Sequence, residues 1–430
     1  MRFAGRILGI SLAWLLGSQL AWATPQVLFG GRLNTSPNTG SDSYVPLARG
    51  AFGSWTLSDV ATGGSNTTLS LVSTPGTIQS LRVTVNVAPG AGTSYQFTVR
   101  QNATDTALTC SIADSSTSCT DSSSTVAVVG GDLLSLEASP ANTPASVTVL
   151  WTVVFDSTAS NEGLLLTGSG AGFGTIPVYT SIDGENGSTT SLNDELTEVV
   201  PVNGTLKNLY VQNWCTPDPG STITTTVMLN GSTTALTCSF GNGSRTCNDT
   251  TNMVTVAVND LVQLKVDSST AQWCVGGSNA RPNVGVTFTP SDSSFVMYGG
   301  IPNGSLTTDD TYYPFPPLSA SGATSESSRQ LLGQATTIGV IRVLLVGAGS
   351  LSCGPYVFTT RVNGADTSNS CTIAIGETAC VGTTTTTIAD GDLVSLEIND
   401  GTCTAGPLYE YTKVSWGLGS AAARRLFRTY

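Results

Sequence analysis

Three stretches of this chain repeat one short pattern. Residues 107–112 read A-L-T-C-S-I, residues 235–240 read A-L-T-C-S-F, and residues 370–373 read S-C-T-I. The cysteine in each stretch opens a C-x8-C pair, and a Gly-Asp-Leu or Asn-Asp-Leu turn follows each pair. The pattern recurs after 128 and then 132–133 residues, which is the length of a domain and too long for a solenoid unit. Three copies of one domain are therefore predicted.

Hydrophobic and polar residues alternate within each copy, which is the period of a strand and not of a helix. Leu81, Val83 and Val85, for example, alternate with Arg82 and Thr84. Val and Thr pack well on a pleated sheet, while Gly, Asn, Ser and Asp divide the chain into short runs. About eight or nine short strands per copy predict an all-β fold of tandem two-sheet β-sandwiches of the jelly-roll type.

The repeat sets the expected domain boundaries. We expect a signal peptide over 1–23, jelly-roll modules over 24–157, 162–290 and 294–418, and a C-terminal tail over 419–430. The first segment has a basic start, an apolar stretch and an A-x-A cleavage site. Linkers of six to eight residues reach only about 20–28 Å, so neighbouring modules must lie close together. A single-chain pseudo-trimer and an extended string of modules both satisfy these linkers, and we favour the pseudo-trimer.

Composition excludes several function classes. The chain has 430 residues, no histidine, 11% charged residues and a net charge of −12. The lack of histidine excludes His-based triads and His-ligated zinc or haem. The acidic balance argues against a nucleic-acid partner. No second apolar run is long enough to cross a membrane, so the mature chain is expected to be secreted, extracellular or on the cell surface, with the periplasm as an alternative.

The ten cysteines all follow the signal peptide, which favours disulfides over reactive or metal-binding thiols. Three pairs share the C-x8-C spacing, and the other four cysteines have no counterpart in the first module. Their paired absence implies that they bond with each other. The predicted bridges are Cys110–Cys119, Cys238–Cys247, Cys371–Cys380, Cys215–Cys274 and Cys353–Cys403.

The second copy also resembles a known family. The strings T-T-T-V-M-L-N-G-S at 224–232, A-L-T-C at 235–238, C-N-D-T-T-N at 247–252 and V-T-V at 254–256 resemble bacterial jelly-roll domains. These domains are similar to tumour necrosis factor and to the globular heads of complement-type collagen proteins. The resemblance implies trimers of identical heads. Here the three heads share one chain and no Gly-X-Y stalk precedes them, which suggests a covalent substitute for the homotrimer.

Two groups of aromatic residues are candidate ligand-binding surfaces. Trp214 and Trp273 each precede a cysteine of one predicted bridge, so they would lie at one loop end and offer a platform for sugar stacking. The alternative is that both rings pack the loops over the disulfide. Tyr312, Tyr313 and Phe315 form a second candidate patch beside several prolines.

Acidic residues raise the question of calcium. The aspartates that recur in the repeated turn are Asp132, Asp260 and Asp392. Aspartate at such a place usually bonds to its own backbone in an Asx-type turn, and we prefer that interpretation to calcium binding. The densest acidic oxygens belong to Asp183, Glu185, Asp194 and Glu195, a weak candidate calcium site for which a solvated loop is the alternative.

Nucleophile-elbow, P-loop and dinucleotide motifs are absent from the sequence, and no cofactor other than calcium is implied. We therefore expect an exported, non-enzymatic monomer acting in surface structure, adhesion or ligand recognition, with a glycan or a surface protein as partner. One alternative is an array of carbohydrate-binding modules. Another is a polysaccharide-active enzyme, which would need two carboxylates about 5–10 Å apart.

Overall fold

A computed structural model describes most of the chain. The described residues are 25–32, 35–48, 55–59, 69–159, 161–168, 177–183, 196–269, 282–291, 295–301, 310–314, 323–326, 331–346, 353–399, 401 and 411–419. The predicted signal peptide and residues 420–430 of the predicted tail lie outside this set. Among the described residues there is no helix long and apolar enough to cross a membrane.

The first sandwich is built from two antiparallel sheets. Its strands are β1 (Gln26–Arg32), β2 (Ser43–Pro46), β3 (Ser70–Leu71), β4 (Gly76–Val85), β5 (Gly90–Gln101), β6 (Thr104–Asp114), β7 (Ser118–Val128), β8 (Leu133–Ala141) and β9 (Val149–Ser157). One sheet has the order β1-β9-β4-β7 and the other the order β2-β8-β5-β6, with β3 also paired to β8. The all-β sandwich prediction is therefore confirmed.

The second sandwich repeats this order. Its strands are β10 (Gly163–Gly168), β11 (Val178–Thr180), β12 (Glu198–Val199), β13 (Gly204–Asn213), β14 (Thr222–Leu229), β15 (Ser232–Gly241), β16 (Thr246–Val256), β17 (Leu261–Ser268) and β18 (Pro282–Pro290). The sheets run β10-β18-β13-β16 and β11-β17-β14-β15, with β12 paired to β17. Each strand thus takes the place of its counterpart in the first sandwich.

The third sandwich differs in one strand. Its strands are β19 (Phe295–Ile301), β20 (Thr311–Pro314), β21 (Leu331–Leu332), β22 (Thr336–Val346), β23 (Tyr356–Val362), β24 (Ala365–Ile373), β25 (Ala379–Gly382), β26 (Thr386–Ile388), β27 (Leu393–Asn399) and β28 (Tyr411–Gly419). β25 and β26 both pair with β22 and together replace the single strand β7 or β16. The numbered module boundaries remain a prediction.

Strand β4 shows how the sequence builds the core. Ile78, Leu81, Val83 and Val85 are buried between the two sheets, and the polar residues between them are more exposed. Two residues separate Ile78 from Leu81, so strict alternation would turn Leu81 outward. A β-bulge at Ser80, whose φ is 59°, returns the side chain of Leu81 to the core face of the sheet. The predicted alternation at Leu81, Val83 and Val85 is therefore confirmed.

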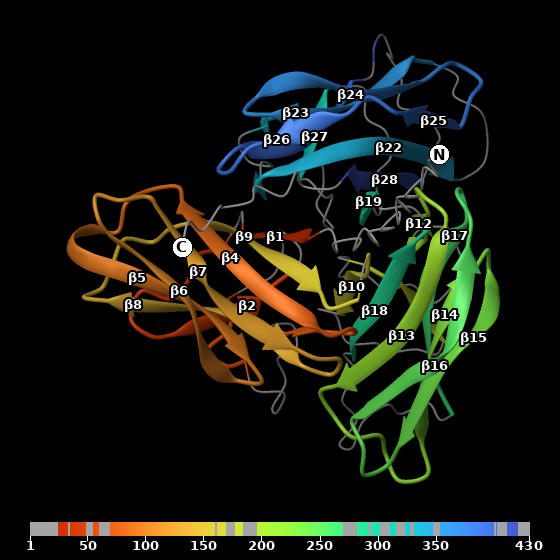
Figure 1. Ribbon diagram of the computed structural model, residues 1–430, viewed down its shortest axis with the longest axis horizontal. Coiled ribbons are helices and arrows are strands. Elements are labelled where there is room, and N and C mark those ends of the chain that lie inside the picture. Colours follow the sequence, from red (N-terminus) through yellow and green to blue (C-terminus); the bar gives the residue numbers. More distant parts are fainter. Residues whose placement is uncertain are drawn as a thin grey trace, which may run out of the picture.

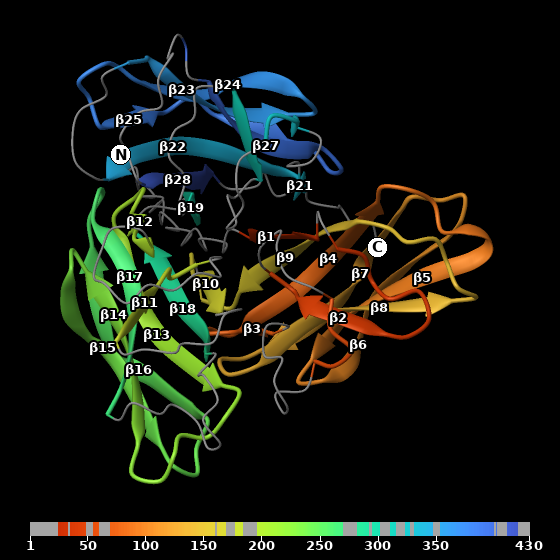
Figure 2. The same cartoon turned by 180° about the vertical axis from the view of Figure 1, so that it is seen from behind.

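The three sandwiches pack around a common centre, with β1, β10 and β19 nearest to it (Figures 1 and 2). The contacts follow one direction around this ring. β3 of the first sandwich packs on β10 and β18 of the second, β12 of the second on β19 and β28 of the third, and β21 of the third on β1 and β9 of the first. The arrangement is a closed ring and not an extended string.

The first and second sandwiches share buried polar contacts. The Gln26 side-chain amide pairs with the backbone of Leu164, donating to its carbonyl oxygen at 3.0 Å and accepting from its N–H at 2.7 Å. The hydroxyls of Ser73 and Thr287 are 2.9 Å apart and both residues are buried. Every such bond satisfies groups that would be unpaired if the sandwiches separated.

The third and first sandwiches share apolar residues instead. Val27 and Phe29 of β1 belong to the hydrophobic cluster of the third sandwich, and Leu150 of β9 packs against it. Gln334 adds a hydrogen bond from its Nε2 to the carbonyl oxygen of Ser80, at 3.3 Å. The first strand of the chain is thus held by the last sandwich.

Candidate functional sites

The C-x8-C pairs are disulfides in all three sandwiches. Cys110–Cys119, Cys238–Cys247 and Cys371–Cys380 each join the edge strands of the two sheets. Cys215 and Cys353 are also disulfide-bonded. Their predicted partners, Cys274 and Cys403, lie outside the described residues, so that pairing stays a prediction.

The predicted tryptophan platform is described only in part. Trp214 is partly buried and packs against the hydrophobic core of the second sandwich. Trp273 lies outside the described residues. Whether the two rings form a platform or pack the loops over the disulfide, as the alternative has it, stays a prediction.

The predicted tyrosine patch needs a correction. Tyr313 is only 4% exposed and belongs to the core of the third sandwich, so it cannot offer a surface ring to a ligand. Tyr312 is its neighbour in β20, and its side chain must therefore point to the opposite face of the sheet. The Tyr312 hydroxyl donates to Glu397 Oε1 at 3.0 Å, and the Arg361 guanidinium lies 5.6 Å from the ring centroid. Phe315 lies outside the described residues.

Of the four predicted calcium residues, only Asp183 lies within the described structure. Asp183 uses its Oδ1 to accept the N–H of Leu166 at 3.0 Å, and its own N–H donates to Glu198 Oε1 at 3.2 Å. Glu185, Asp194 and Glu195 lie outside the described residues. Among the described residues no three His, Cys, Asp or Glu side chains are grouped as metal ligands.

The recurrent aspartate closes its own turn, as the Asx-type interpretation expects. Asp260 Oδ2 accepts the N–H of Ala257 at 2.7 Å, and its Oδ1 accepts the Asn230 amide at 2.8 Å. Asn230 Oδ1 in turn accepts the N–H of Leu261 at 2.8 Å. The same hydrogen bonds link Asn102 with Asp132 within the first sandwich, and Asn363 with Asp392 within the third. This Asn–Asp lock ties two turns together in each sandwich.

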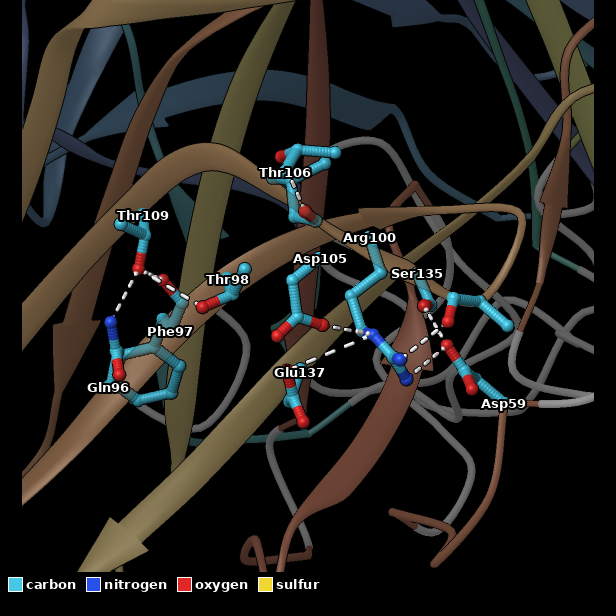
Figure 3. A network of polar contacts seen from close by, with 12 residues as sticks. Asp59, Gln96, Phe97, Thr98, Arg100, Asp105, Thr106, Thr109, Ser135 and Glu137 are labelled. Carbon is cyan, nitrogen blue, oxygen red and sulfur yellow. Dashed lines mark hydrogen bonds and ion pairs between the residues drawn. The ribbon is translucent and has the colours of Figure 1, made fainter.

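A charged cluster around Arg100 lies on the outer sheet of the first sandwich (Figure 3). Its guanidinium contacts Asp59 at 2.9 Å, Asp105 at 2.7 Å and Glu137 at 3.9 Å. Asp59 also accepts the Ser135 hydroxyl at 2.9 Å. Because Asp59 comes from the segment between β2 and β3, the cluster clamps that segment to the sheet. We call this group the arginine clamp.

Burial and charge together set the ionisation of the clamp. Burial raises the pKa of Glu137, and the charge of Asp105 adds to this while Arg100 opposes it. Burial works against the charge of Arg100, but the carboxylates of Asp59 and Glu137 outweigh it and raise the pKa of the guanidinium. Burial, with Glu137 adding, raises the pKa of Tyr44 to about 12. The arginine therefore remains charged and holds its carboxylates.

The third sandwich carries the same clamp. Arg361 pairs with Glu326 at 3.1 Å, with Glu397 at 2.9 Å and with Asp366. Glu326 accepts the Ser395 hydroxyl at 2.6 Å, as Asp59 accepts that of Ser135. Within its described strands the second sandwich lacks this clamp. The register of its paired strands places Met228 where the first sandwich has Arg100, and Lys265 where the first has Glu137.

A shallow hollow of about 440 Å³ occupies the outer sheet of the second sandwich. Its lining residues are Thr222, Thr224, Thr226, Lys265, Asp267, Ser268 and Ser269. The Lys265 ammonium lies 2.8 Å from the Asp267 carboxylate. The Thr224 hydroxyl bonds to Ser239 and that of Thr226 to Thr237, each at 2.8 Å. The hollow therefore combines hydroxyl groups with one ion pair.

Comparison with known proteins gives no family. No protein-family model matches this chain, and no curated protein matches it significantly.

Proposed function

We propose that this protein is an exported, non-enzymatic head, built from three sandwiches, that serves surface structure, adhesion or ligand recognition. The observation that carries the proposal is the closed ring. It places one edge strand of every sandwich, β1, β10 or β19, near the centre and directs the sheets containing β5, β14 and β23 outward (Figure 1). Such a ring presents three outer surfaces on one rigid body.

The strand order supports the proposed kinship with heads similar to tumour necrosis factor. In domains of that type the first and last strands lie side by side, and the trimer forms through that region. Here β1 pairs with β9, β10 with β18 and β19 with β28, all antiparallel, and these pairs lie at the centre of the ring. One chain then supplies the three heads that three separate subunits supply in a homotrimer.

The disulfides support export, because bridges of this kind persist in oxidising compartments. Extracellular or cell-surface localisation, with residues 1–23 as the cleaved leader, is part of the proposal. A monomeric mature chain is also part of it.

The carboxylates of the arginine clamp favour a structural role over catalysis. A glycosidase needs two carboxylates that are free to act on a sugar, but the Arg100 guanidinium contacts both Asp59 and Glu137. A charged arginine placed between them occupies the space that a sugar would take. The clamp therefore supports a segment of chain and is not a reaction centre.

A glycan array with the mature protein, run with and without calcium, tests the proposal. On soluble polysaccharides assayed for reducing sugars alongside the array, we expect no release of reducing ends, whether or not the protein binds them. Release of reducing ends that Glu137→Gln or Glu397→Gln abolishes, without loss of folding, would replace the proposal with the enzyme alternative.

Carbohydrate binding is a second candidate, and the hollow on the second sandwich favours it. Neighbouring hydroxyls and a Lys–Asp pair can both donate to and accept from the hydroxyls of a sugar. Thr226→Val should weaken binding on the array at least threefold. Thr98→Val is the matched control, because Thr98 holds the same strand position in the first sandwich, outside the hollow. Equal effects of the two variants would remove this candidate.

A further inference from the structure

At every interface of the ring the same strand position meets the same turn of the neighbouring sandwich, but the contacting residue of that turn stands two places before the lock aspartate in the first and third sandwiches and one place before it in the second. One position lies on the strand beyond the β-bulge and holds Arg82 in β4, Tyr210 in β13 and Arg342 in β22. The other lies in the turn closed by the Asn–Asp lock of the neighbouring sandwich. We call the first the strand position and the second the turn position.

The three pairs are chemically distinct. Arg82 of the first sandwich lies 3.3 Å from the Asp390 carboxylate of the third. Arg342 of the third sandwich donates to the side-chain oxygen of Asn259 of the second, at 2.8 Å. Tyr210 of the second sandwich covers Gly130 of the first so closely that a Cβ there would lie 2.6 Å from Tyr210 Cζ.

We propose that these pairs fix the order in which the three sandwiches dock around the ring. Each contact is heterologous, because a turn of one sandwich meets a strand of the next. A three-membered ring of such contacts has two possible cyclic orders. The linkers between β9 and β10 and between β18 and β19 make neighbours in both orders, and the side-chain pairs match in the observed order.

A reversed order changes all three pairs and leaves two of them unmatched, because Arg82 on Asn259 would repeat the Arg–Asn pair that Arg342 makes. Reversing the order of the sandwiches places Tyr210 on the turn that carries Asp390, and the tyrosine side chain provides no positive charge for that carboxylate. It also places Arg82 on Asn259 and Arg342 on Gly130, and a glycine offers the guanidinium no side-chain acceptor. The Nε atoms of Arg82 and Arg342 are buried and have no hydrogen-bond partner among the described residues. Each arginine therefore depends strongly on the turn that it faces.

The interface between the third and first sandwiches depends most on its matched residue pair. No linker joins these two sandwiches, whereas linkers join the other two pairs. The ring closes there through the Arg82–Asp390 pair and the apolar contacts of β1. The docking order is independent of any ligand that the protein binds.

The test transplants one pair into another interface. Gly130→Asp and Tyr210→Arg, combined in the full mature chain, place the Arg–Asp pair of the third interface between the first and second sandwiches. Each single variant should lower the urea midpoint of unfolding, because the aspartate collides with Tyr210 and the arginine faces a bare glycine. The double variant should recover at least half of the summed loss.

The control keeps composition and charge constant. Tyr210→Arg with Gly40→Asp places the new carboxylate at an exposed glycine of the first sandwich, where only Asn38 is near, and it should recover nothing. If the Gly130→Asp chains do not fold, the reciprocal variant Arg82→Tyr with Asp390→Gly gives the same comparison at the third interface. Additive losses in the double variant, or equal recovery in the control, would overturn the proposal.

Discussion

A methyl group at Gly285 should force the first and second sandwiches apart. Gly285 lies in β18 of the second sandwich, and its backbone rests on β3 of the first. A Cβ at this position would lie under 3.0 Å from the carbonyl oxygen of Leu71, a separation that real Cβ atoms essentially never show. Because the atom that it meets belongs to the backbone, no side chain can turn aside, and the two strands must separate by roughly 1 Å.

The loss follows from the contacts that this movement breaks. The hydrogen bond between Ser73 and Thr287, now 2.9 Å long, would exceed bonding distance and leave two buried hydroxyls unpaired, at about 1–3 kcal/mol. Dispersion contacts across the same strands would lose about a quarter to a half of their attraction. With strain of about 1–3 kcal/mol from the added methyl group, Gly285→Ala should cost roughly 2–6 kcal/mol.

Urea unfolding of the mature protein measures this loss, and Gly40→Ala is the control. Gly40 is exposed, so its substitution should stay within about 0.5 kcal/mol of the wild type. Small-angle scattering on the same samples reports the ring, since a compact chain of this length has a radius of gyration of about 22 Å. A Gly285→Ala protein with wild-type stability and wild-type scattering would refute the packing of β3 on β18.

Three further outcomes are expected. Asn230→Ala should lower the unfolding free energy by about 1–3 kcal/mol in thermal or urea melts, because the N–H of Leu261 and the Asp260 carboxylate both lose a partner. Arg361→Met, which introduces the residue type of the second sandwich, should cost about 3 kcal/mol in urea melts at pH 7 by leaving Glu397 without its cation. Burial alone would raise the pKa of Asp249, but hydrogen bonds from Asn252 and Thr237 outweigh it and lower that pKa. The ionised carboxylate therefore stabilises the fold above about pH 4, and this part is lost as the pH falls through the lowered pKa. Asp249→Asn should accordingly flatten the acid side of a stability profile measured from pH 7 to pH 2, and an unchanged acid slope would contradict the lowered pKa.

Local patterns in the sequence predict much of this fold. Alternation over Leu81, Val83 and Val85 follows from the pleat of a single strand. The C-x8-C spacing fits a pair of edge strands joined by a short turn, and the three bridges are present. The recurrent aspartate bonds within three residues of itself, at Val129, Ala257 and Ala389. Each of these features depends on residues that are near each other in the chain.

Features that join distant segments are harder to predict. Asn102, Asn230 and Asn363 have φ of 52°, 48° and 53°, a conformation that asparagine tolerates, and the repeat alone could have marked them. Their aspartate partners, however, lie 29 or 30 residues away. Asp59 and Glu326, the carboxylates that reach the arginine clamp, differ in type, and no repeated motif surrounds them.

The error at Tyr313 has a simpler cause. Adjacent residues of a strand point to opposite faces, so Tyr312 and Tyr313 could not both be exposed on one sheet. The pairing of β20 with β27 sets which of them faces the core. A strict period-two interpretation of residues 311–314 would have kept Tyr312 as the surface residue and assigned Tyr313 to the interior.

The three copies hold different residue pairs where they contact each other, whereas the Asn–Asp lock within each copy is the same. The Asn–Asp lock is complete within each sandwich, and all three copies retain it. The strand and turn positions face different sandwiches, and there the copies hold an Arg–Asp, an Arg–Asn and a Tyr–Gly pair. In a trimer of identical subunits one pair of residues must serve all three interfaces. Joining the copies in one chain removes that requirement, so each interface can have its own solution and thereby specify which sandwich it accepts.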